Sequence, residues 1–458
     1  MKRSFSAVLA LLMTMSLMLS ACGGAVTPKR TPSPEATEVP VVTQSPAEAT
    51  DTPALTQTPA EATNVPAATP TLASTKPAEP TRITIWHGWA ADILRPIEAV
   101  FRAYEATHAG ILIELSKVDN LNDALAIALP AGEGPDIVAW SSDQIGINVL
   151  SGNIVALNAV GIDEAFLRST YQPAAASAML WNGQIWGLPE TEEGIALVYN
   201  KALVGEADFP SDPLDFAGLL DAAKTFAEKN PGKFLICNQG LGHDDAYHAA
   251  PIYFGHGMPG YLDNQGQVHM NTPEGLAAAE WIKAFSAYAP KETSHDICRA
   301  MLLEGQAAAW WTDRWAIADI AAAGLDYGMK AFGRPFVSAR TLMLTPNALA
   351  RKHNAASLEV MKYFTGAEVQ KDLALVNKTV PAASAAIESA ELQSAVALQG
   401  FAASLAMGVP VPSTPLAEVQ WEVVGAATTA IWNGTMTPAD AMRAAQATIE
   451  NKIRLMMK

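Results

Sequence analysis

Arg82-Ile83-Thr84-Ile85-Trp86 is the first of three short apolar segments, and it is followed by Ile111-Leu112-Ile113-Glu114-Leu115 and Asp136-Ile137-Val138-Ala139-Trp140. Segments of this length that are rich in β-branched residues predict buried strands. Between the first and second segments, apolar residues recur at helical spacing at positions 93, 97, 101 and 104. Between the second and third, an alanine- and leucine-rich helix is predicted near 122–129. Strands that alternate with helices predict an α/β fold with a mainly parallel sheet covered on both faces.

The rest of the chain is richer in helix and is too long for one core. Residues 81–458 exceed the roughly 250–300 residues at which a single hydrophobic core stops growing, so we expect two lobes. Ligands of parallel sheets bind beyond the carboxyl ends of the strands, and Trp86, Trp140 and Asp143 fall at or just past such ends. Periodicity and helix breakers predict later helices at Thr272–Tyr288, Trp315–Ala323, Ala355–Thr365, Glu368–Val376 and Pro438–Leu455.

The N-terminal segment has the features of an export signal. Lys2 and Arg3 precede an apolar run that is too short to span a bilayer, so residues 1–21 are predicted to be a secretory leader. Leu19-Ser20-Ala21-Cys22, followed by two glycines, resembles the bacterial lipoprotein box. This resemblance implies cleavage before Cys22 and a diacylglycerol on its sulfur, which would anchor the protein outside the cytoplasm. An ordinary leader with an incidental cysteine is the alternative.

The segment that follows has a different composition from the rest of the chain. Eleven of the thirty prolines lie between Thr27 and Pro80, together with Thr, Ala, Ser and Glu, and no aromatic residue occurs there. Such a segment buries too little apolar surface to offset the entropy of the chain. Residues 22–80 are therefore predicted to be a lipid-bearing cysteine with a disordered tether.

Charge and motifs exclude several classes of function. The formal net charge is −16, and a strongly acidic exported domain is repelled by nucleic acid and by anionic lipid surfaces. The sequence contains no Gly-x-Ser-x-Gly elbow, no phosphate-binding glycine-rich loop with Lys and no His-Glu-x-x-His motif, which argues against an enzyme. We therefore expect no bound nucleic acid and no cofactor.

Two small clusters leave alternatives open. Cys237 and Cys298 either form a disulfide, as extracytoplasmic cysteines often do, or are buried as small apolar residues. His243-Asp244-Asp245, with His248 three residues further on, is a conceivable metal site. Its glycine-rich surroundings favour a polar loop that lines a cleft, and we expect no metal.

The eleven tryptophans point to a carbohydrate ligand. Sugars present apolar C–H faces edged by hydroxyl groups, so a sugar site combines flat aromatic rings with carboxylates and amides. Trp281, Trp310 and Trp311 have the surroundings of core residues. Other tryptophans have polar neighbours in the sequence: Trp140 near Asp143, Trp181 beside Asn182, Trp315 after Asp313 and Arg314, and Trp421 before Glu422.

From about Arg82 onward, the chain resembles the family 1 extracellular solute-binding proteins of ABC importers, the group that is similar to maltose-binding protein. The most specific segment is Asn182-Gly183-Gln184-Ile185-Trp186-Gly187-Leu188-Pro189, a predicted hairpin that leads to Ala196-Leu197-Val198-Tyr199-Asn200-Lys201. Gly134-Pro135-Asp136-Ile137-Val138 before Trp140-Ser141-Ser142-Asp143 is a further landmark, as are Gly305-Gln306-Ala307-Ala308 and Pro335-Phe336-Val337.

This resemblance implies a two-lobe, type II periplasmic-binding-protein-like fold in which each lobe has a mainly parallel sheet flanked by helices. Residues 81–192 with 342–390 would form the first lobe, and residues 193–341 with 391–458 the second. Hinges are expected near Thr191–Ile195, near Phe336–Leu342 and near 388–395. The resemblance also implies a monomer that closes around a maltose-type di- or oligosaccharide and delivers it to the transmembrane subunits of an ABC permease.

The resemblance also implies a set of ligand-binding residues on both lobes. Trp140, Asp143 and Glu193 match first-lobe sugar contacts, and Asp245, Tyr247, Trp315 and Trp421 match second-lobe contacts. After the first strand, this chain has His87-Gly88-Trp89 in place of an acidic-basic pair, so Trp89 is expected to add an aromatic wall. Gln144 stands where maltose binders have an arginine, which leaves the acidic contacts without an opposing Arg or Lys.

Two other functions fit some of the same residues. Aromatic rings beside Asp143, Glu193 and Asp245 would also suit a cationic ligand such as a polyamine, through cation–π contacts and carboxylates. A glycosidase that used Asp143 and Glu193 as acid and base is the enzymatic alternative. The family resemblance favours binding of a neutral, multi-hydroxyl ligand without turnover.

Overall fold

The computed structural model describes residues 79–457. The predicted leader, Cys22 and nearly all of the predicted tether lie outside these residues and stay predictions. The described residues belong to one compact unit, Thr75–Lys458, so the expected lobe boundaries within it also stay predictions. No helix in residues 79–457 combines the length and the apolar character that crossing a bilayer requires.

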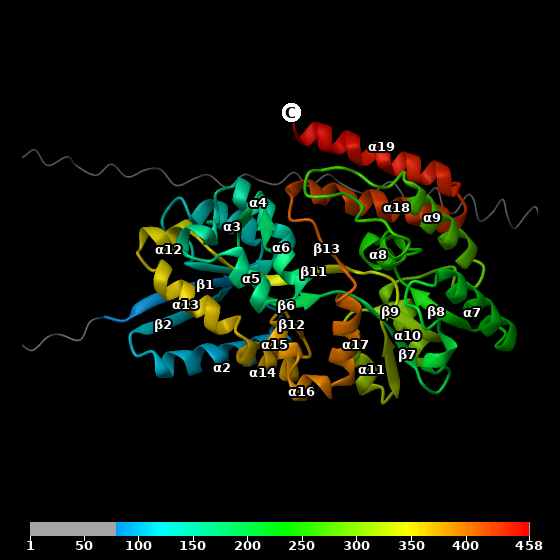
Figure 1. The fold of residues 1–458 in the computed structure, drawn as a ribbon, viewed down its shortest axis with the longest axis horizontal. Helices are drawn as coiled ribbons and strands as arrows, with labels where there is room; N and C mark the ends of the chain where they lie inside the picture. Colours follow the sequence, from blue (N-terminus) through cyan, green and yellow to red (C-terminus); the bar gives the residue numbers. More distant parts are fainter. Residues whose placement is uncertain (1–78, 458) are drawn as a thin grey trace, which may run out of the picture. The chain divides into compact units, whose positions relative to one another are not determined.

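The first sheet has the strand order β12-β6-β11-β3-β1-β2 (Figure 1). β1 pairs in parallel with β2 and β3, as the sequence predicts. β11, β6 and β12 then add to β3 in antiparallel fashion, and the short β13 pairs in parallel with the start of β11. The strands are β1 (Thr81–His87), β2 (Ile111–Lys117), β3 (Ile137–Ser141), β6 (Leu188–Glu193), β11 (Phe336–Leu344), β12 (Val380–Pro381) and β13 (Val409–Pro410).

Helices pack around this sheet through the apolar positions that the sequence indicates. The four periodic residues at 93, 97, 101 and 104 are the buried face of the first of these helices. They join Ile83 and Ile85 of β1 in one core. The helices are α2 (Ala91–Thr107), α3 (Leu121–Ala128), α4 (Ile145–Leu150), α5 (Glu164–Thr170), α6 (Pro173–Ala178), α12 (Pro346–Ala350), α13 (Asn354–Phe364), α14 (Ala367–Asn377), α15 (Ser384–Ile387) and α16 (Ala390–Gln393).

A second sheet has the order β10-β7-β9-β8, with β8 and β9 parallel and the other pairs antiparallel. The expectation that this sheet is mainly parallel is therefore wrong, because β7 arrives directly from the first sheet and pairs with both of its neighbours in antiparallel fashion. Trp281, Trp310 and Trp311 are buried around it, as expected. The strands are β7 (Ala196–Asn200), β8 (Phe234–Asn238), β9 (Ala307–Thr312) and β10 (Tyr327–Lys330). The helices are α7 (Phe216–Lys229), α8 (Ala246–Gly255), α9 (Pro273–Phe285), α10 (His295–Leu303), α11 (Trp315–Ala322), α17 (Val396–Leu405), α18 (Gln420–Asn433) and α19 (Pro438–Met456).

The chain passes between the two cores on neighbouring strands. The predicted hairpin forms as β4 (Leu180–Trp181) and β5 (Gln184–Ile185), and β6 follows it. Only Gly194 and Ile195 separate β6 from β7 of the second sheet. β11 begins at Phe336 in the second core and ends among residues of the first core. Gly194 is required at this crossing, because a Cβ there would overlap the backbone oxygen of Phe336 and the side chain of Leu405.

Cys237 of β8 and Cys298 of α10 form a disulfide in this structure, with Cα atoms 5.4 Å apart. Both residues are fully buried among apolar side chains. The bond joins positions 61 residues apart and ties α10 to β8, an edge strand of the second sheet. This selects between the two alternatives that the sequence leaves open.

We expect reduction of this disulfide to lower the free energy of unfolding by about 4 kcal/mol, the loop-closure contribution for a loop of this length. Chemical denaturation of the wild-type protein with and without reductant measures the change. The Cys237→Ala/Cys298→Ala double variant is the control, because its stability should not respond to reductant. A free thiol at Cys237 or Cys298 in the non-reduced wild-type protein would contradict the assignment.

Candidate ligand-binding site

One group of candidate residues lies at the carboxyl ends of β8 and β9. These two parallel strands end at Asn238 and Thr312, and the helices α8 and α11 begin shortly after them. The side chains of Asp245, Tyr247 and Trp315 therefore come from the starts of helices at one edge of the second sheet. This is where ligands of α/β sheets bind, because loops that follow parallel strands meet there.

Asp245 caps the N-terminus of α8 and is paired with a histidine. Its Oδ1 accepts from the backbone N of His248 (3.1 Å), and its Oδ2 lies 2.7 Å from the His248 Nδ1. Burial by itself raises the pKa of Asp245, but the hydrogen bonds and charge of His248 outweigh it, so the pKa is lowered. The His248 ring also lies 6.3 Å from that of Trp315, which is 47% exposed. Within the described residues, no group of three ligating side chains is arranged to hold a metal.

Glu193, at the end of β6, is held by two arginines. Its Oε1 lies 3.0 Å from Nε of Arg340, on β11, and 3.9 Å from Nη2 of Arg314, just before α11. The expectation that the acidic contacts lack an opposing Arg or Lys is therefore wrong for Glu193. The sequence gives no local signal for these contacts, because the arginines lie more than a hundred positions from Glu193 along the chain.

Tyr247 connects Glu193 to an aromatic cluster. Its hydroxyl donates to the backbone oxygen of Glu193 (3.3 Å), and its ring stacks on Phe336 at 6.1 Å. Trp421, on α18, lies 6.4 Å from the Tyr247 ring and 5.4 Å from the Phe336 ring. The structure therefore brings Glu193, Tyr247 and Trp421 together around the crossing of β6 and β11.

Trp140 reaches the same region from β3. Its ring covers Gly88, where any Cβ would overlap the indole, and the Gly88 oxygen accepts from Nη1 of Arg340 (3.4 Å). Gly88 is therefore in contact with both the Trp140 ring and Arg340, the partner of Glu193, and only a residue without a side chain leaves room for the ring. Sequence reasoning missed this role of Gly88, although the His87-Gly88-Trp89 segment was singled out.

Asp143 follows Trp140 in a short 3-10 helix, Ser142–Gln144. Its Oδ2 accepts from Nε2 of Gln144 (3.2 Å), and its Oδ1 is buried without a hydrogen-bond partner. Burial and the charge of Asp143 together raise the pKa of Glu418, which lies in the turn before α18. Asp143 is thus near the element that carries Trp421.

Trp89 does not add an aromatic wall. Its side chain is fully buried, its ring packs against Phe101 and Phe364, and its Nε1 donates to Oε2 of Glu190 (2.9 Å). The ring turns inward because the core between β1 and α2 offers it both apolar contacts and an acceptor. The expected contact of Trp89 with a ligand is corrected accordingly.

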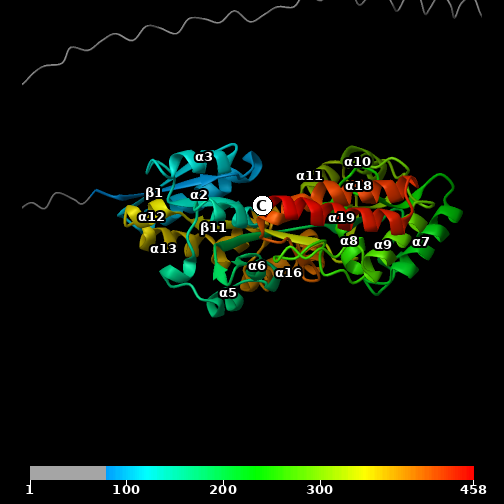
Figure 2. The ribbon, with the colours of Figure 1, turned by 90° about the horizontal axis from the view of Figure 1, so that it is seen from above.

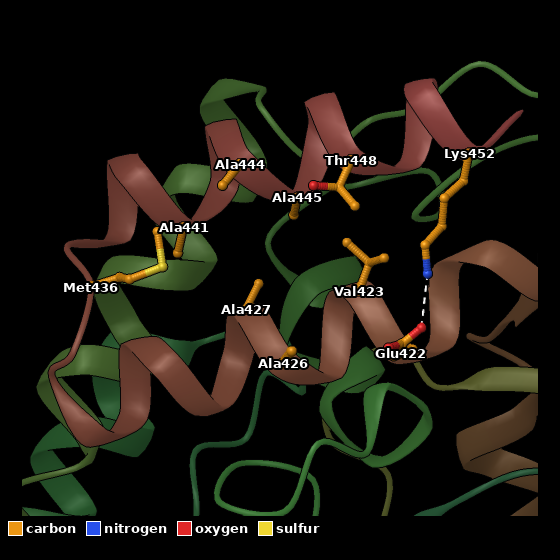
Figure 3. A pocket seen from close by; sticks show the side chains of 10 residues that line it. All are labelled: Glu422, Val423, Ala426, Ala427, Met436, Ala441, Ala444, Ala445, Thr448 and Lys452. Carbon is orange, nitrogen blue, oxygen red and sulfur yellow. Dashed lines mark hydrogen bonds and ion pairs between the residues drawn. The ribbon is translucent and has the colours of Figure 1, made fainter. Parts of the chain in front are cut away.

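A separate pocket of about 360 Å³ lies between α18 and α19, which run along one another in both views (Figure 1, Figure 2). Figure 3 shows that alanines, Val423, Met436 and Thr448 line it. Lys452 pairs with Glu422 across one end at 2.8 Å. Glu422, the sequence neighbour of Trp421, is therefore engaged in this exposed ion pair, and none of the eight predicted ligand-binding residues lines the pocket.

Comparison with known proteins agrees with this arrangement. A family model of bacterial extracellular solute-binding proteins matches residues 99–400. The chain belongs to this family. A maltotriose-binding protein of Pyrococcus abyssi is 26% identical over 354 residues, 74% of this chain and 75% of the relative. A galactooligosaccharide-binding protein of Bacillus subtilis is 22% identical over 71% of this chain and 78% of the relative.

Solved structures show the same fold. A crystal structure of a cyclo/maltodextrin-binding protein complexed with maltotetraose superposes with a TM-score of 0.72 at 23% identity, covering 82% of this chain and 98% of the other. The predicted α/β, two-lobe binding-protein fold and the resemblance to maltose-binding proteins are thus confirmed. Family membership also makes the chain a solute-binding protein rather than an enzyme, so the glycosidase alternative is not retained.

Three buried carboxyl groups of this solute-binding protein lie at the crossing between the sheets. Burial raises the pKa of Glu190 and of Glu192, both on β6, to about 7. The pKa of Asp313 is raised to about 8, mainly by burial and to a smaller extent by the negative charge of Glu193. Glu192 has the simplest surroundings, since its Oε1 accepts from the backbone N of Ala175 (3.1 Å).

We expect Glu192 to make the protein less stable as the pH rises from its ordinary pKa of 4.5 to about 7. In this range the folded state holds a proton that the unfolded chain has lost, so the free energy of unfolding falls, by up to about 3 kcal/mol. Glu192→Gln should remove this loss, because its amide does not titrate. The difference in free energy of unfolding between the variant and the wild type should therefore favour the variant more at pH 8 than at pH 5. Urea unfolding across this pH range measures it. Glu228→Gln, on the exposed face of α7, is the control, and parallel pH profiles for Glu192→Gln and the wild type would refute the prediction.

Proposed function

We propose that this solute-binding protein captures a maltose-type di- or oligosaccharide outside the cytoplasm, is anchored by a lipid on Cys22, and delivers the sugar to the permease of an ABC importer. The observation that carries the proposal is the combination of aromatic rings with buried polar atoms that have no partner within the protein. Trp140 and Trp315 supply the rings. Tyr247 and Trp421 add two further rings. The carboxylates of Glu193 and Asp245, which are held in place by their partners, provide hydrogen-bond acceptors.

Among the described residues, several of the side-chain atoms without a hydrogen-bond partner belong to this region. They include Asp143 Oδ1, Gln239 Oε1, His248 Nε2, Asp313 Oδ2 and both amide atoms of Gln420. A buried polar atom without a partner costs about 1–3 kcal/mol. A ligand with many hydroxyl groups donates and accepts in several directions and therefore offers partners to such a mixed set. This favours a sugar over an apolar or singly charged ligand.

The charges of the site favour a neutral ligand. Arg340 and Arg314 compensate Glu193, and His248 is paired with Asp245. A polyamine would need carboxylates free of such partners, because its recognition depends on unpaired negative charge. Of the three carboxylates that would suit it, Glu193 and Asp245 are already paired and only Asp143 is left. The cationic alternative is therefore not favoured.

The relatives support the same ligand class. The two similar proteins named above bind maltotriose and galactooligosaccharide, and the solved structure contains maltotetraose. We extend to this chain the feature that these ligands share, a short chain of hexoses. Anchoring rests on the sequence around Cys22, and delivery to a permease rests on the family.

We expect Trp315→Ala to weaken maltotriose binding by more than about tenfold, because half of the indole is exposed at the site and would stack on a sugar face. Isothermal calorimetry against a panel of maltose-type and galactose-type oligosaccharides measures this. Leu150→Ala, which truncates an apolar side chain on α4 that is 66% exposed, should bind as the wild type does. Absence of heat or fluorescence response to every sugar in the folded wild-type protein would overturn the proposal.

Lipid anchoring is tested separately from ligand binding. We expect Cys22→Ala to abolish incorporation of a fatty-acid label and to move the protein from the membrane fraction to the soluble fraction, because the thiol is the proposed attachment atom. Immunoblots of fractionated cells measure the distribution. Cys237→Ala/Cys298→Ala should remain labelled, and full labelling of the Cys22→Ala variant would contradict the assignment.

A further inference from the structure

A cavity of about 630 Å³ lies directly beside Trp315. Its walls come from five elements, namely the start of α2, α11, the start of β10, the end of α14 and the start of α17. The volume falls within the range of about 300–1,000 Å³ that is typical of small-molecule sites. Trp315 and Arg314 belong both to this cavity and to the proposed sugar site, so the two are continuous.

The walls of this cavity differ chemically from the sugar site. Trp315, Val376 and Val396 are among the exposed large apolar side chains of the described residues, with 47%, 64% and 63% of their surface accessible, and all three line this cavity. Ala318 and Ala321 of α11 extend the same apolar surface. Such side chains are normally scattered on a protein surface, whereas a cluster of them in a concavity indicates a binding surface.

The polar groups of the cavity are few. Asp92, Arg314, Asn377 and Lys378 are its charged or amide side chains, and Tyr327 adds one hydroxyl. Arg314 is directed to Glu193, and the Lys378 ammonium donates to the backbone oxygen of Leu375 (2.6 Å). A further hexose would bring several hydroxyl groups to walls that offer few partners. An apolar group would lose little hydration and would cover the exposed valines.

We propose that this cavity is a second subsite, which accepts an apolar substituent attached to the sugar, such as the aryl or alkyl group of a glycoside. This inference rests on the proposed sugar-binding function and narrows its ligand class from free oligosaccharides to apolar-substituted ones. Trp315 would contact the sugar and its substituent together, because it lies at the junction of the two subsites.

The test compares the affinities of maltose, methyl maltoside, 4-nitrophenyl maltoside and maltose that carries a 4,6-benzylidene group on its non-reducing end. The last two place an aromatic group at opposite ends of the sugar, so either orientation in the site is sampled. We expect one of them to bind about tenfold more tightly than methyl maltoside, as follows if roughly 55 Å² of apolar surface leaves water. Calorimetry on the tether-bearing protein measures all four.

Val376→Ser/Val396→Ser should remove this tenfold gain and leave maltose affinity unchanged, since both side chains are exposed and lie outside the proposed sugar contacts. Ile127→Ser, at an exposed apolar position of α3, is the matched control and should keep the gain. Equal affinities of the methyl and both aryl sugars, or a gain that survives in the double variant, would overturn the second subsite alone. Failure of all four sugars to bind would overturn the proposed function itself.

Discussion

The rest of the site depends on the pairing of the Glu193 carboxylate with two arginines. The chain crosses between its two cores on β6 and β11, and Glu193 stands opposite Ser338 at that crossing. A partly buried carboxylate there would be costly alone. Arg340, on the neighbouring strand, supplies the opposite charge at 3.0 Å, and Arg314 adds a second cation from the second sheet. The pair also fixes the backbone oxygen that Tyr247 binds.

This arrangement makes the site polar without making it strongly charged. The aromatic rings of Trp140, Tyr247, Trp315 and Trp421 come from β3, α8, α11 and α18. Residues close to them in the chain, namely Asp143, His248, Asp313 and Gln420, carry buried atoms without partners. The free protein bears the cost of those atoms, whereas a ligand that pairs them relieves it. Contacts from both sheets also let a ligand favour one relative arrangement of them, which is the thermodynamic requirement for closure on binding.

Local sequence patterns were sufficient to predict many of the helices and strands. The predicted strand at 111–115 is observed as Ile111–Lys117, and the predicted helix at 438–455 as Pro438–Met456. Periodicity and helix breakers are local properties, so tertiary packing shifted their ends by only a few residues. Trp89 shows the limit of the same reasoning. Its position after a strand suggested a ligand contact, but a buried acceptor, Glu190, and two phenylalanine rings draw the indole into the core.

The sequence by itself determined the alternation of strands and helices and the family, because each of these depends on spacing or on a continuous motif. The tertiary structure alone decided that Arg340 and Arg314 neutralise Glu193, that Cys237 pairs with Cys298, and that three exposed apolar side chains from separate helices share one cavity. The physical reason is the same in each case. These contacts join residues that are distant in the chain, and only strand pairing and helix packing in the folded protein bring their atoms within reach.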